Sequence, residues 1–493
     1  MKNVIRLLGI IALTAVIGFS MAGCDDGDTS SGGGSELTGA VTITSGGAAI
    51  TNAKTDTLLT AAYSGTETVS YQWKRGATDV SNSQTITPSE AGSYTVTVSA
   101  SGYNDKTSAA VTVEFTPVTS GLSFSDYGTG YSVSKGTATD ATVIIPASYK
   151  GLPVTRIDGG LIVIVGGIAD TSNIGGFAEY TNMTSITIPS SVTRIDVNAF
   201  YNSGIWNNAP DNSVVYADKW VVGYKGTISG YLTLRSDTIG IGDYAFAGSG
   251  LTSITIPSSV TSIGQEAFRG CSSLTSITIP SSVTSIGEWA FYNCSGLTGI
   301  TIPSGVTSIS NYAFSGCSGL TSITISEGVT SIGYDAFYGC RGLTSITIPS
   351  SVTSIVTGAF HCYESLTSIT VASGNTVYRS EGNCLIQRSN NTLILGCKNS
   401  VIPTSVTSIG NRAFYLCNGL TSITIPTSVT SIGDYAFGDI VRLTSVTLGT
   451  ISSENFSSSA FPGNLRTLYF AGGGGAGTYV RSMGSSFNNW SKL

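Results

Sequence analysis

The chain has 493 residues, of which 41% are apolar and 11% are charged, so it is long enough for several domains. Its 61 glycines, together with abundant serine and threonine, favour turns and strands over helices. The 23 basic and 29 acidic residues give a net charge of −6, which argues against nucleic acid or an anionic membrane surface as an electrostatic partner.

The first residues predict a targeting segment. A basic start is followed by the almost wholly apolar run Leu7–Phe19, which is short for a membrane span. Small residues stand directly before Cys24, as in a bacterial lipobox. We therefore expect residues 1–23 to be a lipoprotein signal peptide, Cys24 to be lipidated and residues 24–36 to form a flexible tether. An ordinary secretory signal with an incidental cysteine is the alternative.

Residues 37–115 predict a small β-sandwich, because short stretches of alternating apolar and polar residues follow one another there. Trp73, with Tyr94 in an Ala-Gly-Ser-Tyr segment further on, resembles the core of an immunoglobulin-like domain. In that resemblance Trp73 packs in the core and Tyr94 forms a tyrosine corner. No cysteine pair joins the sheets, so we expect an Ig-like module without a disulfide that acts as a spacer; a binding role of its own is the alternative.

A repeat of about 23 residues dominates the rest of the chain. The unit Leu320–Cys340 has a short Ser-Ile-Thr-Ile strand with one apolar face, then Val-Thr-Ser-Ile-Gly, then Ala-Phe and a cysteine. The Ala-Phe pair marks the phase, at Phe268, Phe291, Phe314 and Phe337. A fixed period of this length indicates a solenoid, in which neighbouring coils cover one another and no coil is stable alone.

The pattern Leu-x-x-Ile-x-Ile-Pro-x-x-Val-x-x-Ile-Gly-x-x-Ala-Phe-x-x-Cys resembles the BspA-like leucine-rich repeat family of bacterial surface proteins. The resemblance covers residues 141–470 and implies a mainly β, leucine-rich-repeat solenoid. Serine stands where the general leucine-rich pattern has asparagine after the strand, so we expect no asparagine ladder. The resemblance also implies adhesion or protein–protein binding at the cell surface, with host matrix or other cell-surface proteins as partners.

Two longer spacings interrupt the array, near residues 202–230 and 373–401. Each contains alternating apolar residues and predicts a β-hairpin that replaces or enlarges a coil, either as a structural variant or as a binding loop. The apolar run Leu161–Ile168 is too short to span a bilayer and predicts a buried coil edge.

Both ends of a solenoid need a cover. We expect residues 116–140 to cap the first coil. The period ends after Phe461, and residues 471–493, with Tyr479, Phe487 and Trp490, are expected to fold over the last coil.

The cysteines leave two interpretations open. Four of them recur every 23 residues and so form one column of the solenoid: Cys271, Cys294, Cys317 and Cys340. They are either small buried side chains beside the phenylalanine or neighbours within disulfide distance in an oxidising compartment. Cys384 and Cys397, in the second insertion, are either free or joined as a hairpin disulfide. With no Cys-x-x-Cys and a single histidine, a zinc site is not expected.

The sequence contains no catalytic constellation. The histidine, His361, lies between Phe360 and Cys362 and is expected to be an incidental surface residue. No serine or threonine has a basic partner at a recognised spacing, no glycine-rich loop leads from a strand into a helix, and the carboxylates are not paired. We therefore expect no enzyme activity, no cofactor and no metal.

Two exposed surfaces are candidates for binding. The outward Ser and Thr of the strands, such as Ser322 and Thr324, form a hydroxyl ladder that is nearly identical from coil to coil and so offers little selectivity. The residues flanking Ala-Phe vary and are rich in aromatic and acidic types, and aromatic residues are enriched in binding hot spots. We define seven of these as the aromatic ridge and predict that it contacts partners: Trp289, Tyr292, Tyr312, Tyr334, Tyr338, Tyr415 and Tyr435. A solvated edge without a binding role is the alternative.

These observations together predict a lipid-anchored protein of the bacterial cell envelope that mediates protein binding or adhesion through its solenoid. A structural envelope scaffold without a single ligand and a carbohydrate-binding surface module are the alternatives.

Overall fold

The structure is a computed structural model that describes residues 35–45, 48–49, 52–54, 59–86, 92–114, 119–160, 163–165, 168–170, 175–361, 365–472, 475–482 and 489–493. The chain divides into two units, Met1–Thr116 and Pro117–Leu493, which are described separately. The expected signal peptide, the lipidation site Cys24 and almost all of the tether lie outside the described residues.

The described part of the first unit consists of two main β-sheets that share one core. One sheet has the strand order β3 (Ala48–Ala49), β2 (Val41–Ser45), β5 (Leu59–Tyr63), β8 (Thr85–Ile86). The other has the order β4 (Asn52–Lys54), β12 (Val111–Glu114), β9 (Gly92–Ser99), β6 (Ser70–Arg75), β7 (Thr78–Ser81), and β11 (Lys106–Thr107) also pairs with β9. A separate pair is formed by β1 (Ser35–Glu36) and β10 (Tyr103–Asn104). Trp73 is fully buried against residues of both sheets, and its indole N–H donates to the carbonyl of Ser83 at 2.9 Å. The immunoglobulin-like class and the tyrosine corner at Tyr94 stay predictions.

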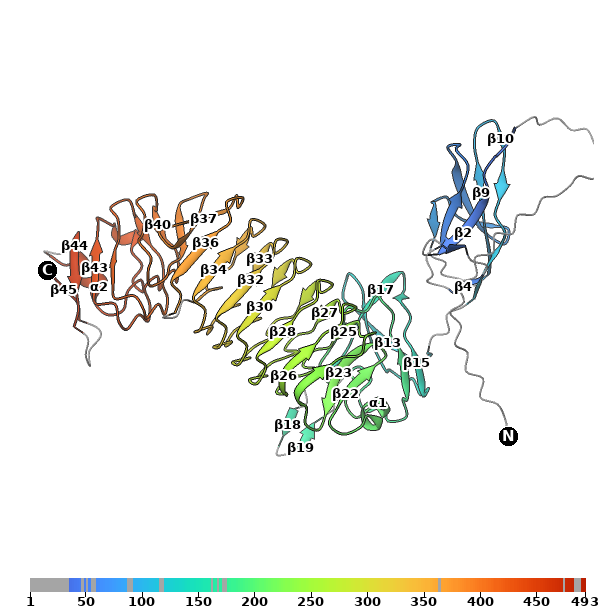
Figure 1. Cartoon of the computed structure of the whole chain (residues 1–493), viewed down its shortest axis with the longest axis horizontal. Coiled ribbons are helices and arrows are strands. Elements are labelled where there is room, and N and C mark those ends of the chain that lie inside the picture. The colour runs from blue at the N-terminus through green and yellow to red at the C-terminus, as the bar shows by residue number, and fades with distance from the viewer. Residues whose placement is uncertain are drawn as a thin grey trace, which may run out of the picture. The chain divides into compact units, whose positions relative to one another are not determined.

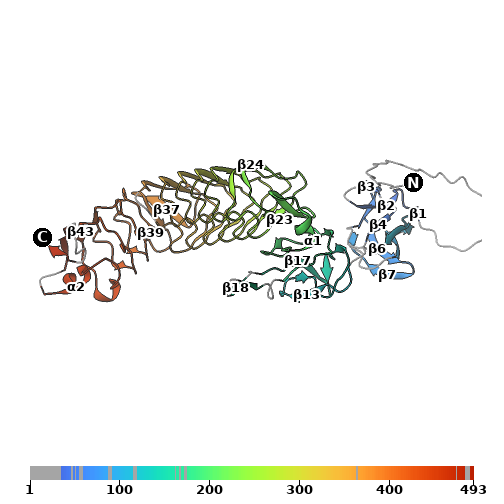
Figure 2. The same ribbon diagram turned by 90° about the horizontal axis from the view of Figure 1, so that it is seen from below.

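The second unit is a solenoid in which most coils contribute short strands to two columns of parallel strands (Figures 1 and 2). The first column contains β15 (Thr142–Ile144), β20 (Ser185–Thr187), β24 (Ser229–Thr233), β26 (Gly250–Thr255), β28 (Ser276–Thr278), β30 (Gly299–Ile302), β32 (Ser322–Ile325), β34 (Ser345–Ile348), β36 (Ser368–Val371), β41 (Ser422–Thr424) and β43 (Ser445–Leu448). The second contains β17 (Leu152–Ile157), β21 (Arg194–Ile195), β25 (Gly240–Ile241), β27 (Ser262–Ile263), β29 (Ser285–Ile286), β31 (Ser308–Ile309), β33 (Ser331–Ile332), β35 (Ser354–Ile355), β40 (Ser408–Ile409) and β42 (Ser431–Ile432). Residues one repeat apart pair directly, as Ile300 does with Ile323.

The apolar residues of the repeat form the core. In the unit Leu320–Cys340, the side chains expected to point inward are buried, except that Ile323 is half-buried. One cluster of buried side chains runs from Val221 to Trp490, and a second covers the first coils. The expected solenoid of about 23-residue coils is therefore confirmed.

The phenylalanines of the Ala-Phe pairs stack on one another inside this core. The rings of Phe268 and Phe291 are 2° from parallel with centroids 5.2 Å apart, and the stacking continues to Phe314 at 5.3 Å. Each turn is also tied to the next by the backbone, since the Phe291 N–H donates to the carbonyl of Ala313 at 2.8 Å. A buried aromatic side chain contributes on the order of 2 kcal/mol, so this ladder holds successive coils in register.

Both longer spacings contain antiparallel hairpins that rejoin the second column. The first has α1 (Gly204–Asn208), β22 (Ser213–Ala217) and β23 (Trp220–Lys225), and β23 pairs in parallel with β25. The second has β37 (Tyr378–Glu381), β38 (Cys384–Gln387) and β39 (Thr392–Leu395), and β39 pairs in parallel with β40. Each hairpin therefore enlarges one coil, as expected from the sequence.

Antiparallel strands lie at both ends of the solenoid. Before the first coil, β13 (Ser123–Asp126) pairs with β14 (Tyr131–Ser134), and within that coil β16 (Ser148–Tyr149) pairs with β17. At the other end, after η1 (Ser453–Asn455) and α2 (Leu465–Phe470), β44 (Gly477–Val480) pairs with β43 and with β45 (Ser491–Lys492). Tyr479 and Trp490 are buried there, and Phe487 lies outside the described residues. The antiparallel β44 ends the parallel stacking and covers the edge of the last coil.

The run Leu161–Ile168 contributes to a separate hairpin. β18 (Val163–Val165) and β19 (Ile168–Asp170) pair with each other and with no other described strand. The expectation of a coil edge is therefore wrong, because these two strands form a sheet of their own among the described strands. The burial of these side chains lies outside what the structure describes. No helix in the described part of the chain is long and apolar enough to cross a bilayer.

Candidate interaction surface

The hydroxyl ladder lies on the outside of the first column, as expected. Ser322, Thr324 and their equivalents are exposed, and among the predicted positions Ser253 alone is half-buried. The adjoining threonines use their hydroxyls internally, since Thr321 Oγ1 donates to the carbonyl of Thr298 at 3.0 Å, and the equivalent bond recurs along the column. This surface repeats one arrangement and has little to distinguish one partner from another.

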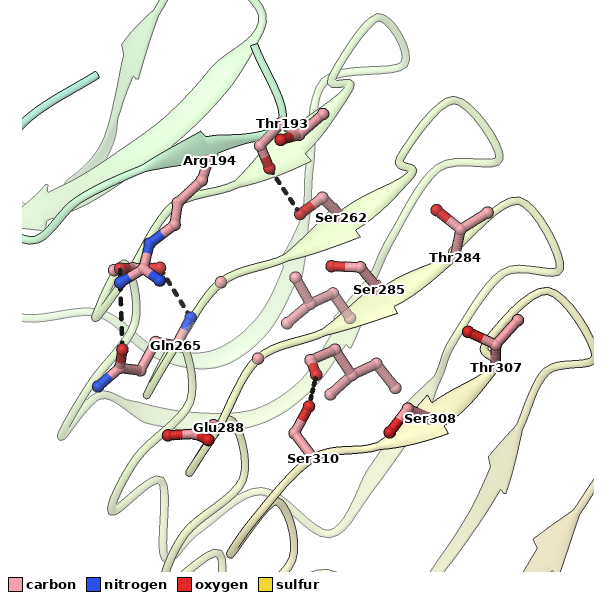
Figure 3. A pocket seen from close by; sticks show the side chains of 15 residues that line it. Thr193, Arg194, Ser262, Gln265, Thr284, Ser285, Glu288, Thr307, Ser308 and Ser310 are labelled. Atoms are coloured by element: carbon pink, nitrogen blue, oxygen red, sulfur yellow. Dashed lines mark hydrogen bonds and ion pairs between the residues drawn. The ribbon is translucent and has the colours of Figure 1, made fainter. Parts of the chain in front are cut away.

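The second column contains a polar groove of about 450 Å³ (Figure 3). Ser285 on β29 and Ser308 on β31 line it, together with Thr284 and Thr307, which directly precede these strands. The groove thus presents mainly hydroxyl groups.

An ion-pair network lies at the end of the groove that is nearer the N-terminus. Arg194 Nη2 lies 2.7 Å from Asp243 Oδ2, and Arg194 Nε lies 2.9 Å from Asp196 Oδ1. Arg194 also donates to the side chain of Gln265 at 3.1 Å (Figure 3). Burial raises the pKa of Asp243 to about 6, although the positive charge of Arg194 opposes the rise. These charges already have partners within the protein.

The aromatic ridge is built on an unusual backbone position. The residue directly before Ala-Phe has a positive φ in coil after coil: 58° at Trp289, 56° at Tyr312, 57° at Arg412 and 53° at Tyr435. The left-handed conformation is unfavourable by roughly 1–2 kcal/mol for a residue with a side chain. It is held by hydrogen bonds between coils, such as the bond of 2.9 Å from the Tyr312 N–H to the carbonyl of Tyr334.

The first half of the ridge is a continuous row of rings. Trp289 and Tyr312 stack with centroids 3.8 Å apart and planes 9° from parallel. Tyr292 lies edge-on to Trp289 at 4.9 Å, and Tyr334 lies edge-on to Tyr312 at 5.5 Å. The structure therefore brings together four residues that the sequence singled out.

Arg412 joins the two halves of the ridge. Its Nη1 donates to the hydroxyl of Tyr334 at 3.0 Å, although the two residues are 78 positions apart. Its guanidinium lies over the ring of Tyr415, 5.7 Å from the centroid, and Tyr435 lies edge-on to Tyr415 at 6.4 Å. Arg412 stands at one of the variable positions that flank Ala-Phe, but the sequence does not predict its contact with Tyr334.

The ridge is less exposed than the sequence suggested. Tyr435 is 49% exposed and Tyr338 is 40% exposed, whereas the other five members are half-buried. The prediction that all seven are exposed is wrong, because neighbouring rings and the Arg412 side chain cover part of one another.

His361 is buried, which corrects the expectation of a surface residue. Its Nδ1 lies 2.8 Å from Asp335 Oδ1, and its ring lies edge-on between Tyr338 at 5.5 Å and Tyr415 at 5.1 Å. The position after Phe360 is the position of Tyr338 in the preceding repeat, so the imidazole continues an aromatic row. His361 therefore packs against two members of the aromatic ridge, Tyr338 and Tyr415, from the buried side.

The seven described cysteines are buried and free. In the column, Cys294 Sγ donates to the carbonyl of Phe268 at 3.0 Å, and Cys317 Sγ donates to the carbonyl of Phe291 at 3.1 Å. This agrees with small buried side chains rather than with disulfides, and Cys384 and Cys397 are likewise free thiols. Cys362 lies outside the described residues. Within the described residues, no group of acidic, cysteine and histidine side chains could hold a metal ion.

Stacked parallel strands, a leucine at the start of most coils and a ladder of phenylalanines define a leucine-rich-repeat solenoid. A family model described as BspA type Leucine rich repeat region matches the chain in six copies, over residues 171–221, 239–367, 290–396 and 386–473. The match covers more than half of the chain, so the chain belongs to this family.

Several solved structures are similar to this chain. A leucine rich cell surface protein from Faecalibacterium prausnitzii A2-165 is 27% identical, with a TM-score of 0.41, and the match covers 69% of this chain and 78% of that one. A leucine-rich repeat protein from Bacteroides ovatus ATCC 8483 is 22% identical, with a TM-score of 0.36 and coverage of 70% and 87%. The pneumococcal vaccine antigen PcpA is 19% identical, with a TM-score of 0.29 and coverage of 67% and 69%. A search of the curated proteins found no match.

Proposed function

We propose that this protein is an adhesin-like protein of the bacterial cell surface, anchored by lipid at Cys24, that binds protein partners through the aromatic ridge. The observation that carries the proposal is the unbroken row of contacts from Tyr292 through Trp289, Tyr312 and Tyr334 to Arg412. Aromatic and arginine side chains are the types that dominate binding energy at protein interfaces.

The choice of side chain at the left-handed position supports a functional role. Trp289 and Tyr312 occupy left-handed positions, where glycine or asparagine would be less strained. The left-handed position belongs to the repeat, since Asn198, Glu266 and Asp335 also occupy it, and the ridge differs in placing large aromatic side chains there. The solenoid core does not require these aromatic rings, because Glu266 occupies the same left-handed position in an equally regular coil.

The remaining parts of the chain fit a surface location. The lipidated Cys24 would attach the protein to a membrane, and the tether with the first unit would serve as a spacer. The Faecalibacterium relative is described as a cell surface protein, which is consistent with this arrangement. Globomycin should block processing of the precursor, and unchanged processing would contradict lipidation at Cys24.

The binding proposal is tested by affinity capture with the immobilised protein. Extracts of cell-surface and matrix proteins are passed over the wild type, the ridge variant Trp289→Ala/Tyr312→Ala/Tyr334→Ala and the control variant Ser276→Ala/Thr278→Ala/Thr324→Ala. We expect a partner that binds the wild type and the hydroxyl-ladder control but not the ridge variant. Equal capture by all three proteins would refute the ridge as the binding surface. A glycan array run in parallel tests the carbohydrate alternative.

A further inference from the structure

The ridge contains a recess at the second insertion. Its volume is about 340 Å³, and its lining residues are Tyr334, Val356, Thr357, Asn411, Arg412, Asp434 and Tyr435. The coil of β35 has Val356, Thr357 and Gly358 where the preceding repeat has Gly333, Tyr334 and Asp335. The following coil, which contains β39, has no Ala-Phe pair. The row of rings is therefore interrupted, and Arg412 reaches across to Tyr334.

The walls of the recess are partly apolar. Val356 is 43% exposed and Tyr435 is 49% exposed, so two of the exposed large apolar side chains of the solenoid meet at this one place. A neighbouring aliphatic or aromatic group of a ligand would remove both from water.

The polar groups of the recess are the donors of Arg412 and Asn411, the hydroxyls of Tyr334 and Thr357, and the carboxylate of Asp434. The guanidinium of Arg412 uses one N–H on Tyr334 and forms no ion pair with a carboxylate among the described residues, whereas Arg194 and Arg269 do. Asn411 Oδ1 already accepts the backbone N–H of Asp434 at 2.8 Å. One carboxylate oxygen of Asp434 accepts hydrogen bonds from Ser457 and Ser459 in the next coil.

We infer that this recess binds a carboxylate, namely the acidic side chain of a partner protein whose neighbouring residue is apolar. The inference rests on the proposed function and adds the chemistry of its ligand. An ionised carboxylate is an acceptor-only group whose two oxygens match the fork of a guanidinium. The bond from Arg412 to Tyr334 and the ring of Tyr415 position the guanidinium before binding, which lowers the entropic cost.

The test is a selection of phage-displayed random heptapeptides on the immobilised protein. The baits are the wild type, Arg412→Gln and the control Arg442→Gln, which removes the same charge from an exposed residue that does not line the recess. We expect the wild type and the control to enrich peptides with an Asp or Glu beside an apolar residue. Synthetic peptides from that pool should bind Arg412→Gln at least tenfold more weakly, and replacing their Glu by Gln should have the same effect.

A second variant guards against a folding defect. Tyr334→Phe keeps the ring and removes only the hydroxyl that accepts from Arg412, so it should weaken the same peptides by a smaller factor. No acidic enrichment, or equal binding by all variants, overturns the inference. Binding of acidic glycans in place of acidic peptides also overturns it. If the Trp289 variant loses a captured partner while Arg412→Gln retains it, the proposed function stands and the recess inference fails.

Discussion

The indole of Trp289 and the phenol ring of Tyr312 lie face to face, 3.8 Å apart, at the same position of successive coils. Both residues have a positive φ, so the backbone repeats an unfavourable conformation to present two stacked rings. Each ring limits the rotamers of the other, which makes the surface rigid before any partner arrives. This pair leads to the first prediction.

At Trp289, replacement by glycine should destabilise the protein less than replacement by alanine. The difference should be about 1 kcal/mol, because glycine adopts a positive φ without strain. Chemical denaturation monitored by fluorescence measures it. Tyr292 is the control: its φ is not positive, so alanine should be the milder change there. Alanine milder than glycine at Trp289 would contradict the left-handed backbone.

The phenylalanine ladder should dominate the stability of the central coils. Phe314→Ala removes a fully buried ring that stacks on two neighbours, and it should lower the free energy of unfolding by about 3–5 kcal/mol. Tyr338→Ala, at a 40% exposed ring, should change it by under ~1 kcal/mol. Urea unfolding of both variants measures the two changes in the free energy of unfolding. Similar losses for Phe314→Ala and Tyr338→Ala would contradict the prediction that burial determines the size of the loss.

The described thiols should be inaccessible in the folded protein. Burial raises the pKa of Cys317, Cys384 and Cys417 to about 12, so their thiolates are scarce at neutral and mildly alkaline pH. In a Cys24→Ser/Cys362→Ser variant, which keeps only the seven described cysteines, Ellman's reagent at pH 8 should modify none of them in the native state and titrate all seven after unfolding in denaturant. Fewer thiols after unfolding would reveal disulfides, for instance between Cys384 and Cys397.

Asp243 should make stability fall as the pH rises. Its pKa is about 6 in the folded protein against 3.8 as the ordinary value, so the folded state binds the proton more tightly than the unfolded state. The contribution of this carboxyl is therefore greatest below about pH 4 and is lost as the pH rises through 6, by at most roughly 3 kcal/mol.

The Asp243→Asn variant tests this sign. Asparagine keeps an oxygen that can accept the Gln265 N–H, as Asp243 Oδ1 does at 2.7 Å, and it cannot ionise. Relative to the wild type, the variant should gain stability between pH 4 and pH 7 in denaturation experiments. A relative loss over that interval would mean that the ion pair with Arg194 outweighs the burial of the charge.

The repeat made much of the fold predictable. Each coil repeats the same apolar positions, so Leu320, Val329 and Phe337 could be assigned to the core from spacing alone, and the alternation of Ile323 and Ile325 with polar residues marked the strand. The hairpin of β18 and β19 was not predicted, because an apolar run has the same appearance in a coil strand and in a separate hairpin.

The ridge could be predicted as a set of residues but not as a surface. Its members stand at variable positions of the repeat, which the sequence shows directly. The sign of φ at Trp289, the contact between Arg412 and Tyr334 and the burial of His361 depend on how one coil lies on the next. The coil that contains β39 has no Ala-Phe pair, and Arg412 in the following coil donates to Tyr334; the spacing of the repeat does not reveal this contact.

Hydrogen exchange of the protein with and without a captured partner tests the central claim most directly. We predict slower exchange on binding at the backbone amides of residues 288–293, 311–316, 334–339, 411–416 and 434–439, which carry the aromatic ridge. Strands β28, β32 and β34, which carry the hydroxyl ladder, should exchange at the same rates as before. Protection of those strands, with the ridge segments unchanged, would contradict the account.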